Sequence, residues 1–119
     1  MNRQALEEKF KETDVYPVIT PGFCNGRSPL VILEAVLDGG AKIVQLRDKE
    51  LPERYAADFR QMTRRYDALF IMNDSVDLAV TFGADGVHLG EDDLPVAEAR
   101  QKLPDLLIGA SVRDLDQAL

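Results

Sequence analysis

Residues 41–49, Ala-Lys-Ile-Val-Gln-Leu-Arg-Asp-Lys, join a short apolar run to a polar end, and this stretch does most to decide the predicted fold. Side chains alternate between the two faces of a β-strand, so Ile43, Gln45 and Arg47 share one face and the apolar residues between them share the other. A strand in an open sheet with helices on both sides is usually apolar on both faces. A face that becomes polar toward the end of the strand therefore favours a closed barrel, in which that face points into the lumen near its mouth.

Three further apolar runs also end in polar residues, and each is followed by a helical stretch. Leu69–Met72 is followed by Asn73-Asp74, Gly86–Gly90 by Glu91-Asp92-Asp93, and Leu106–Ala110 by Ser111. In parallel α/β proteins, ligands bind outside the carboxyl ends of the strands. Polar residues gathered at four such ends indicate that they are parts of one site.

The chain alternates between predicted strands and helices, after an amphipathic N-terminal helix with Leu6 and Phe10 on its apolar side. Ser28 before Pro29 is a good N-cap. The predicted strands are Tyr16–Thr20, Ala41–Arg47, Leu69–Asn73, Gly86–Gly90 and Leu106–Ser111, and the predicted helices are Pro29–Asp38, Pro52–Tyr66, Ser75–Phe82, Pro95–Leu103 and the start of one at Asp114–Leu119. This alternation predicts an α/β fold of five βα units with a parallel sheet, in a single domain over residues 1–119.

Charge and composition exclude several classes of partner. Of the 119 residues, 45% are apolar and 29% charged, as is ordinary for one soluble globular domain. The net charge of −7 argues against nucleic acid as a general partner. No apolar stretch is long enough to cross a bilayer, and the polar N-terminal stretch lacks the apolar core of a signal peptide. The single cysteine, Cys24, forms no intrachain disulfide, so a cytoplasmic location is expected.

The polar ends have a structural and a functional interpretation. Arg47 and Lys49 together suit the oxygens of a diphosphate, but residues 47–50 could also form a solvated turn with internal ion pairs. Asn73-Asp74 and Asp92-Asp93 are residue types favoured as helix N-caps. As carboxylates at the ends of neighbouring strands, Asp74 and one of the later pair could instead hold Mg²⁺, which takes oxygen ligands and retains water and substrate phosphates.

His88 and Ser111 give less specific signals. His88 is the only histidine, which excludes a zinc site built from Cys and His ligands. In its strand it is either a packed structural residue or a general base. Ser111 has no histidine and acid in triad order, so it fits a hydroxyl donor to phosphate or substrate better than a nucleophile.

Taken together, these segments resemble the thiamine-phosphate synthase family. The matching segments occur in the family's order and with family-like spacing: Gln45-Leu46-Arg47-Asp48-Lys49, Asn73-Asp74-Ser75-Val76-Asp77-Leu78-Ala79, Gly83-Ala84-Asp85-Gly86-Val87-His88-Leu89-Gly90, Asp93-Leu94-Pro95 and Ile108-Gly109-Ala110-Ser111. The resemblance implies a (β/α)₈ barrel of the TIM type, of which this chain would hold the first five βα units.

The resemblance also implies a reaction and a role for each residue. The family joins hydroxymethylpyrimidine diphosphate to thiazole phosphate and releases pyrophosphate. Diphosphate would leave first, and the thiazole nitrogen would then capture the pyrimidine-methyl cation, while Mg²⁺ and basic side chains stabilise the departing charge. Carried over by motif, Gln45, Arg47, Lys49, Asn73 and Ser111 would bind substrate, Arg47, Lys49 and His88 would be catalytic, and Asp74 and Asp93 would hold Mg²⁺.

Two departures from the family pattern limit what is implied. The family often has Gln at the position of Glu91, and a complete barrel needs about 200 residues or more. We therefore expect no thiamine phosphate from the 119-residue chain alone, and self-association as a homo-oligomer through the strand edge left after the fifth strand. One alternative is the related thiazole tautomerases, which typically lack the acid at Asp93 and carry a histidine where this chain has Arg113. The other is a non-catalytic truncated chain, or a subunit completed by a partner.

Overall fold

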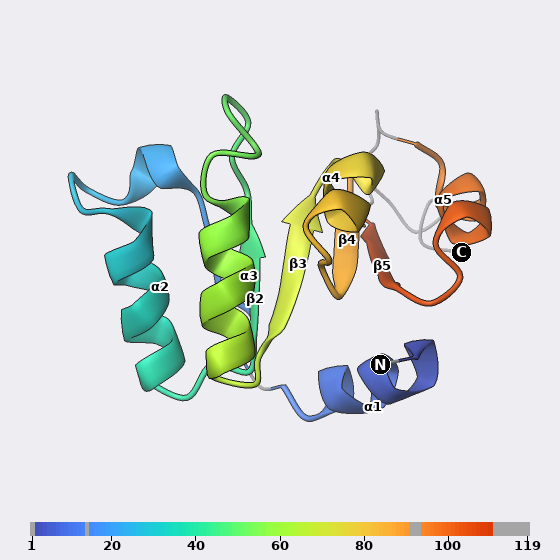
Figure 1. Ribbon diagram of the computed structural model, residues 1–119, viewed down its shortest axis with the longest axis horizontal. Helices are drawn as coiled ribbons and strands as arrows, with labels where there is room; N and C mark the ends of the chain where they lie inside the picture. The colour runs from blue at the N-terminus through green and yellow to red at the C-terminus, as the bar shows by residue number, and fades with distance from the viewer. Residues whose placement is uncertain (1, 14, 91–93, 111–119) are drawn as a thin grey trace.

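Five parallel strands form one sheet whose order follows the sequence (Figure 1). The computed structural model describes residues 2–13, 15–90 and 94–110. The strands are β1 (Val18–Ile19), β2 (Ile43–Leu46), β3 (Leu69–Asn73), β4 (Gly86–Leu89) and β5 (Leu107–Ala110), paired β1-β2-β3-β4-β5. A doubly wound sheet reverses its strand order at a switch point, whereas a TIM-type barrel adds strands consecutively. The consecutive order confirms the predicted part of a barrel.

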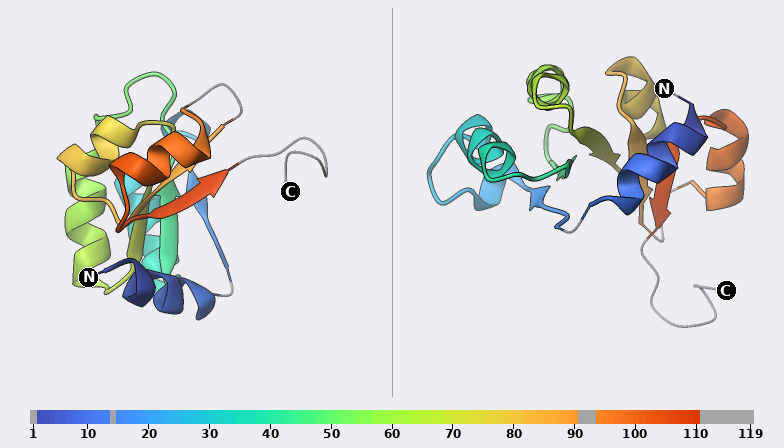
Figure 2. Two further views of the ribbon diagram at one scale, coloured as in Figure 1. Left: turned by 90° about the vertical axis from the view of Figure 1, so that its right-hand side faces the viewer. Right: turned by 90° about the horizontal axis from the view of Figure 1, so that it is seen from below.

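The helices that follow the strands lie on one side of this sheet. They are α2 (Pro29–Asp38), α3 (Ala56–Arg65), α4 (Val76–Thr81) and α5 (Val96–Lys102), and a short 3₁₀ turn, η1 (Pro21–Phe23), precedes α2. Seen from below, these four helices form an arc outside the strands, and α1 (Arg3–Lys11) lies across the lower end of the sheet (Figure 2). Right-handed crossovers that always step in one direction place every helix on the same face.

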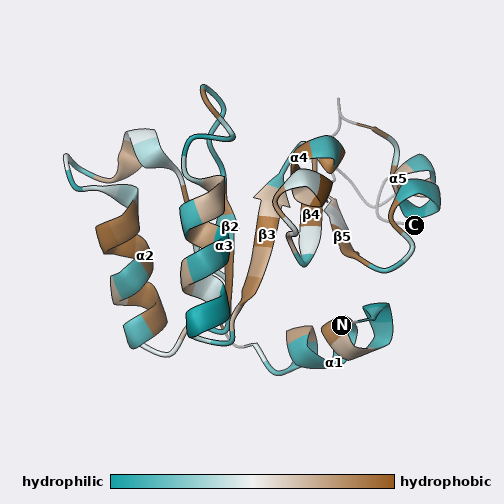
Figure 3. Cartoon of the chain, in the orientation of Figure 1, coloured by the Kyte–Doolittle hydropathy of each residue, from teal (hydrophilic) through white to brown (hydrophobic). Residues whose placement is uncertain are grey.

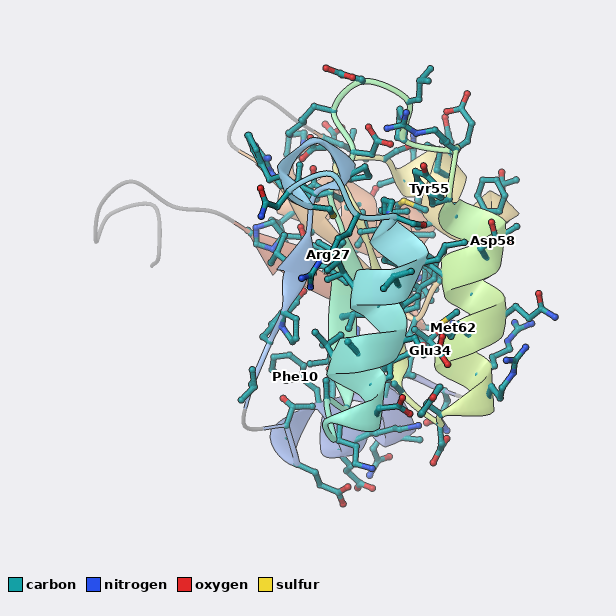
Figure 4. The ribbon with its side chains drawn as sticks, turned by 90° about the vertical axis from the view of Figure 1, so that its left-hand side faces the viewer. Phe10, Arg27, Glu34, Tyr55, Asp58 and Met62 are labelled. Atoms are coloured by element: carbon teal, nitrogen blue, oxygen red, sulfur yellow. The ribbon has the colours of Figure 1, made fainter. Side chains whose placement is uncertain are left out.

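The two faces of the sheet are buried by different partners. Val44 and Leu46 belong to the outer core, which packs the sheet against α2 to α5. Figure 4 shows α2 and α3 side by side, with Glu34 of α2 and Met62 of α3 close to their junction. On the inner face, Leu6 of α1 packs against Ile43, Leu69, Ile71 and Leu107. Thus the predicted apolar side of the first helix is confirmed for Leu6, whereas Phe10 is 41% exposed and its ring makes an edge contact with Tyr16.

Hydropathy follows this arrangement. The strands and much of α2 are hydrophobic, while α3 and α5 carry many hydrophilic residues (Figure 3). Among the residues that the structure describes, no helix has the length and apolar character needed to cross a bilayer.

Several element boundaries differ from the predicted ones for local reasons. The helix Pro29–Asp38 and the strand Leu69–Asn73 are confirmed, and Ser28 caps α2 through a 3.2 Å bond from the Leu30 N–H to its Oγ. The prediction that a helix begins at Pro52 is wrong: α3 begins at Ala56, because residues 52–55 form a turn. The predicted helix Asp114–Leu119 lies outside the described residues.

Two N-cap interpretations are also wrong. The N-cap of α4 is Ser75, and not Asn73 or Asp74. The Ser75 side chain accepts a 3.0 Å bond from the Leu78 N–H. The N-cap position of α5 belongs to Pro95, without a side-chain cap, and not to Asp92-Asp93. The N-cap of α4 is therefore the residue that follows Asn73-Asp74, and this pair stands at the end of β3.

Gly86 makes the inner packing possible, and its replacement is expected to destabilise the fold. A Cβ at this position would lie 2.7 Å from the Leu107 carbonyl oxygen and 2.9 Å from Ile71 Cδ1. Overpacking of this kind costs about 2 kcal/mol, so Gly86→Ala should lower the free energy of unfolding by that amount in urea titrations. Gly22→Ala is the matched control, because a Cβ there meets nothing within 4 Å. Equal stability of the two variants would contradict the close packing of β4 on β3 and β5.

Candidate active site

A cleft of about 520 Å³ lies at the carboxyl ends of β2, β3 and β4. Its lining comes from the inner face of the sheet and from the loops after these strands, as expected for a ligand site in a parallel barrel. The structure brings together here six of the predicted site residues, Gln45, Arg47, Lys49, Asn73, Asp74 and His88, with Tyr16, Val18 and Gly90 completing the lining.

The floor of the cleft holds a chain of hydrogen bonds between buried side chains. Gln45 is 4% exposed and Asn73 is 8% exposed. Asn73 Nδ2 donates to Gln45 Oε1 at 2.9 Å, and Gln45 Nε2 donates to the Tyr16 hydroxyl at 3.2 Å. Buried amides are costly unless they are bonded in this way. The predicted inward face of β2 is thus confirmed, with Gln45 pointing to the same side as Ile43.

Sequence reasoning missed Tyr16 as a site residue. Its ring lines the cleft, and burial raises the pKa of its phenol above the usual value although the Gln45 bond acts in the opposite direction. At neutral pH Tyr16 therefore stays a neutral phenol. Alternation along the first strand was the available signal, because a residue two positions before Val18 shares its face of the sheet.

Lys49 and Asp74 form an ion pair across the mouth of the cleft. The Lys49 side chain is 51% exposed and the Asp74 side chain 26%. Asp74 has left-handed backbone with φ of 68°, and its N–H donates to the His88 carbonyl oxygen at 2.7 Å. This backbone bond fixes the position of the Asp74 backbone, from which the carboxylate extends, between β3 and β4. The interpretation of residues 47–50 as a turn with internal ion pairs is therefore wrong for Lys49, which pairs with the next strand's loop.

Asp48 organises the turn that carries the two basic residues. Its carboxylate accepts bonds from the backbone N–H groups of Glu50 (3.2 Å) and Leu51 (3.0 Å) and from Arg54 Nη2 (3.0 Å). Burial acts to raise the pKa of Asp48, but these backbone bonds and Arg54 outweigh it and lower the pKa below the usual value. Arg47 is half-buried, and its backbone N–H donates to the Ile19 carbonyl oxygen at 2.9 Å, which continues the β1–β2 ladder beneath its side chain.

The lowered pKa of Asp48 predicts a pH dependence of stability. A carboxylate whose pKa is depressed by folding stabilises the native state fully above its unfolded pKa of about 4, and this stabilisation is lost as the pH falls through the folded pKa. Asp48→Asn keeps the shape and removes the charge. Urea titrations should show the largest stability difference between wild type and variant above about pH 5, shrinking as the pH falls below 4. A difference that grows on acidification would contradict the ionised turn.

His88 points from β4 into the lumen, beside Gly109 of β5, which has no side chain. It is paired in register with Asn73 on one side and Gly109 on the other. A Cβ at Gly109 would lie 2.8 Å from His88 Nδ1, so β5 leaves room for the imidazole only because glycine stands there. His88 is accordingly held at the cleft wall by its neighbours, which suits contact with a bound ring.

The remaining predicted site residues, Ser111 and Asp93, lie outside the described residues, as do Glu91 and Asp92. Among the residues that the structure describes, no group of three or more His, Cys, Asp or Glu side chains could hold a metal ion. Among the described residues that line the cleft, Asp74 is the one that carries a carboxylate. It forms the ion pair with the Lys49 ammonium described above.

Comparison with known proteins assigns the chain to a family. A profile of the thiamine monophosphate synthase family, TMP-TENI, matches residues 15–119. The chain belongs to this family. A thiamine-phosphate synthase of Caldicellulosiruptor bescii is 40% identical over 124 residues, which covers 100% of this chain and 57% of the relative. A thiamine-phosphate synthase of Synechocystis sp. is 43% identical over 117 residues, covering 94% of this chain and 33% of the relative.

A solved structure of the family has the same fold. Thiamine phosphate pyrophosphorylase from Pyrococcus furiosus superposes with a TM-score of 0.75 at 40% sequence identity, covering 87% of this chain and 52% of that one. The family predicted from the motifs is thereby confirmed, together with the part-barrel fold. The chain spans from a third to just over half the length of these relatives.

Proposed function

We propose that the cleft is the pyrimidine-diphosphate half of a thiamine-phosphate synthase site. The observation that carries this proposal is the convergence of two buried carboxamides, two basic side chains and one carboxylate at the ends of β2 and β3. The amides suit the edge of a heterocyclic ring, and the basic pair suits diphosphate oxygens. The family supplies the reaction: pyrimidine diphosphate and thiazole phosphate are joined, and pyrophosphate is released.

Each side chain has a distinct task in this proposal. Gln45 and Asn73 hold the pyrimidine at the buried floor, where their bond to each other fixes both amides. Arg47 and Lys49 stand above them at the mouth and neutralise the charge that builds on the leaving diphosphate, an electrostatic contribution that usually dominates such catalysis. His88 lines the wall beside Asn73 and contacts the ring. Ser111 is proposed to donate its hydroxyl to the substrate.

Asp74 and Asp93 are proposed to hold Mg²⁺, which when bound neutralises diphosphate charge as a Lewis acid. The chemistry of Asp74 fits this group, because its carboxylate lies at the mouth of the cleft beside the basic pair. In the chain without ligand, Lys49 supplies the positive charge at Asp74. Lys49 is half-exposed and flexible enough to turn from this carboxylate to an incoming diphosphate.

Calorimetric titration tests the proposal. Hydroxymethylpyrimidine diphosphate should bind the chain at one site per molecule, and Mg²⁺ should strengthen the binding. Inorganic pyrophosphate is the matched probe for the contribution of the ring, and it should bind more weakly because it leaves Gln45 and Asn73 uncontacted. Absence of binding, or binding that Mg²⁺ does not change, would contradict the proposal. We expect no thiamine phosphate from the 119-residue chain alone, and product formation by a verified chain of this length would overturn that expectation.

A further inference from the structure

Tyr16 lies outside the family motifs, but its phenol meets the most buried polar group of the cleft. The Gln45 amide is almost fully buried, and its Nε2 donates to the Tyr16 hydroxyl at 3.2 Å. On its other side the same amide accepts the 2.9 Å bond from Asn73. Tyr16, Gln45 and Asn73 therefore form one continuous chain of hydrogen bonds, called here the Tyr16–Gln45–Asn73 chain, from the segment before β1 to the end of β3.

We propose that Tyr16 is a positioning residue that holds the Gln45 carboxamide in one orientation and thereby sets which pyrimidines the cleft accepts. This inference rests on the proposed function of the cleft. Tyr16 acts through Gln45, so its effect is on the geometry and the donor and acceptor order of the floor rather than on the leaving diphosphate.

The valence of the two amides explains why orientation matters. A primary amide offers two N–H donors on one side and an oxygen acceptor on the other. The chain of hydrogen bonds uses one N–H of Gln45, one N–H of Asn73 and the oxygen of Gln45. Each nitrogen keeps a second N–H, and Asn73 keeps its oxygen as an acceptor. This pattern matches a ring that presents an acceptor nitrogen beside an exocyclic amino group, and it mismatches a ring with a carbonyl oxygen in place of the amino group.

Two contacts position Tyr16 at its end of the hydrogen-bond chain. Its ring packs edge-on against Phe10 with centroids 6.3 Å apart, and the adjoining Pro17 carbonyl oxygen accepts the Gln45 backbone N–H at 3.0 Å. The same two segments are therefore joined twice, once through the backbone and once through the side chains. Without the phenol oxygen, Gln45 Nε2 loses its partner on this side, and the bond from Asn73 is left to hold the amide, so the carboxamide is less firmly positioned.

The first arm of the test needs no ligand. In the NMR spectrum of the 119-residue chain, Tyr16→Phe should shift or broaden the side-chain amide resonances of Gln45 and Asn73. Tyr66→Phe is the matched control, because it removes a phenol that bonds to Asp38 instead, and it should leave both resonances in place. Unchanged Gln45 and Asn73 resonances in Tyr16→Phe would overturn the inference.

The second arm measures selectivity. Wild type should bind hydroxymethylpyrimidine diphosphate more tightly than the analogue with an oxo group in place of the ring amino group. Tyr16→Phe should reduce this ratio of affinities by about tenfold, which is the effect of one hydrogen bond in a buried site. Its affinity for inorganic pyrophosphate should stay that of wild type. An unchanged ratio would overturn the inference and leave the proposed function standing. Failure of wild type to bind either compound would overturn the proposed function, and the NMR arm would still decide the role of Tyr16 in the amide chain.

Discussion

Replacement of Asp74 by asparagine is expected to remove the Mg²⁺ dependence of pyrimidine-diphosphate binding. The Asp74 carboxylate faces the cleft mouth and balances the Lys49 ammonium. Asparagine retains the side-chain shape and tolerates the left-handed backbone at this position, so the fold should be preserved. Loss of an interaction with a charged group costs about 3 kcal/mol, so affinity in the presence of Mg²⁺ should fall by about 100-fold in calorimetric titrations.

Asp77→Asn is the control for this variant. Asp77 is an exposed acid in the first turn of α4, three residues from Asp74, and it does not line the cleft. It should bind the diphosphate as wild type does. Retained Mg²⁺ dependence in Asp74→Asn, or an equal loss in Asp77→Asn, would show that the metal is not held where we place it.

The second large effect is expected at the opposite end of the sheet, where Asp85→Ala should strongly lower the free energy of unfolding. Asp85 accepts bonds from Arg60 Nη1 (3.0 Å) and from the Phe70 backbone N–H (2.9 Å). The Arg60 side chain is 9% exposed, and its Nε is a buried nitrogen without a hydrogen-bond partner among the described residues. Removing Asp85 leaves a buried positive charge, which costs about 3 kcal/mol or more, a large part of a typical domain's stability.

Urea unfolding followed by circular dichroism measures this loss. Asp58→Ala is the control, since Asp58 lies on the exposed surface of α3 (Figure 4) and its loss should change stability little. The double variant Asp85→Ala with Arg60→Met should regain part of the stability, because an apolar side chain replaces the unpaired charge. A double variant less stable than Asp85→Ala alone would contradict this role of the pair.

The sequence alone could predict the fold because its signals were local and repeated. Each strand is a short apolar run, and Gln45 among apolar neighbours marks the face that turns inward. Ser28 followed by Pro29 identifies the start of α2, and in the structure α2 begins at Pro29. Boundaries were less predictable where a turn competes with a helix, as at residues 52–55, whose helical composition is overridden by the bonds that Asp48 makes.

The candidate site was only partly predictable, since its remaining features depend on contacts between distant residues. No local pattern shows that Lys49 pairs with Asp74, 25 residues away, or that Tyr16 bonds to Gln45, 29 residues away. The N-cap preference of Asn and Asp suggested a structural role at the end of β3, but Ser75 takes that role one residue later. The binding roles of Gln45, Arg47, Lys49, Asn73, His88 and Ser111, and the metal roles of Asp74 and Asp93, remain proposals.

The most direct test of the central claim is NMR mapping of the ¹⁵N-labelled chain during titration with hydroxymethylpyrimidine diphosphate and Mg²⁺. The side-chain amides of Gln45 and Asn73 and the backbone amides of Arg47 and Asp74 should shift together and saturate at one ligand per chain. Amides near the Arg60–Asp85 pair, at the other end of the sheet, should stay unchanged. Shifts confined to that end, or no saturable shifts at the ends of β2 and β3, would contradict the assignment of the cleft as the pyrimidine-diphosphate site.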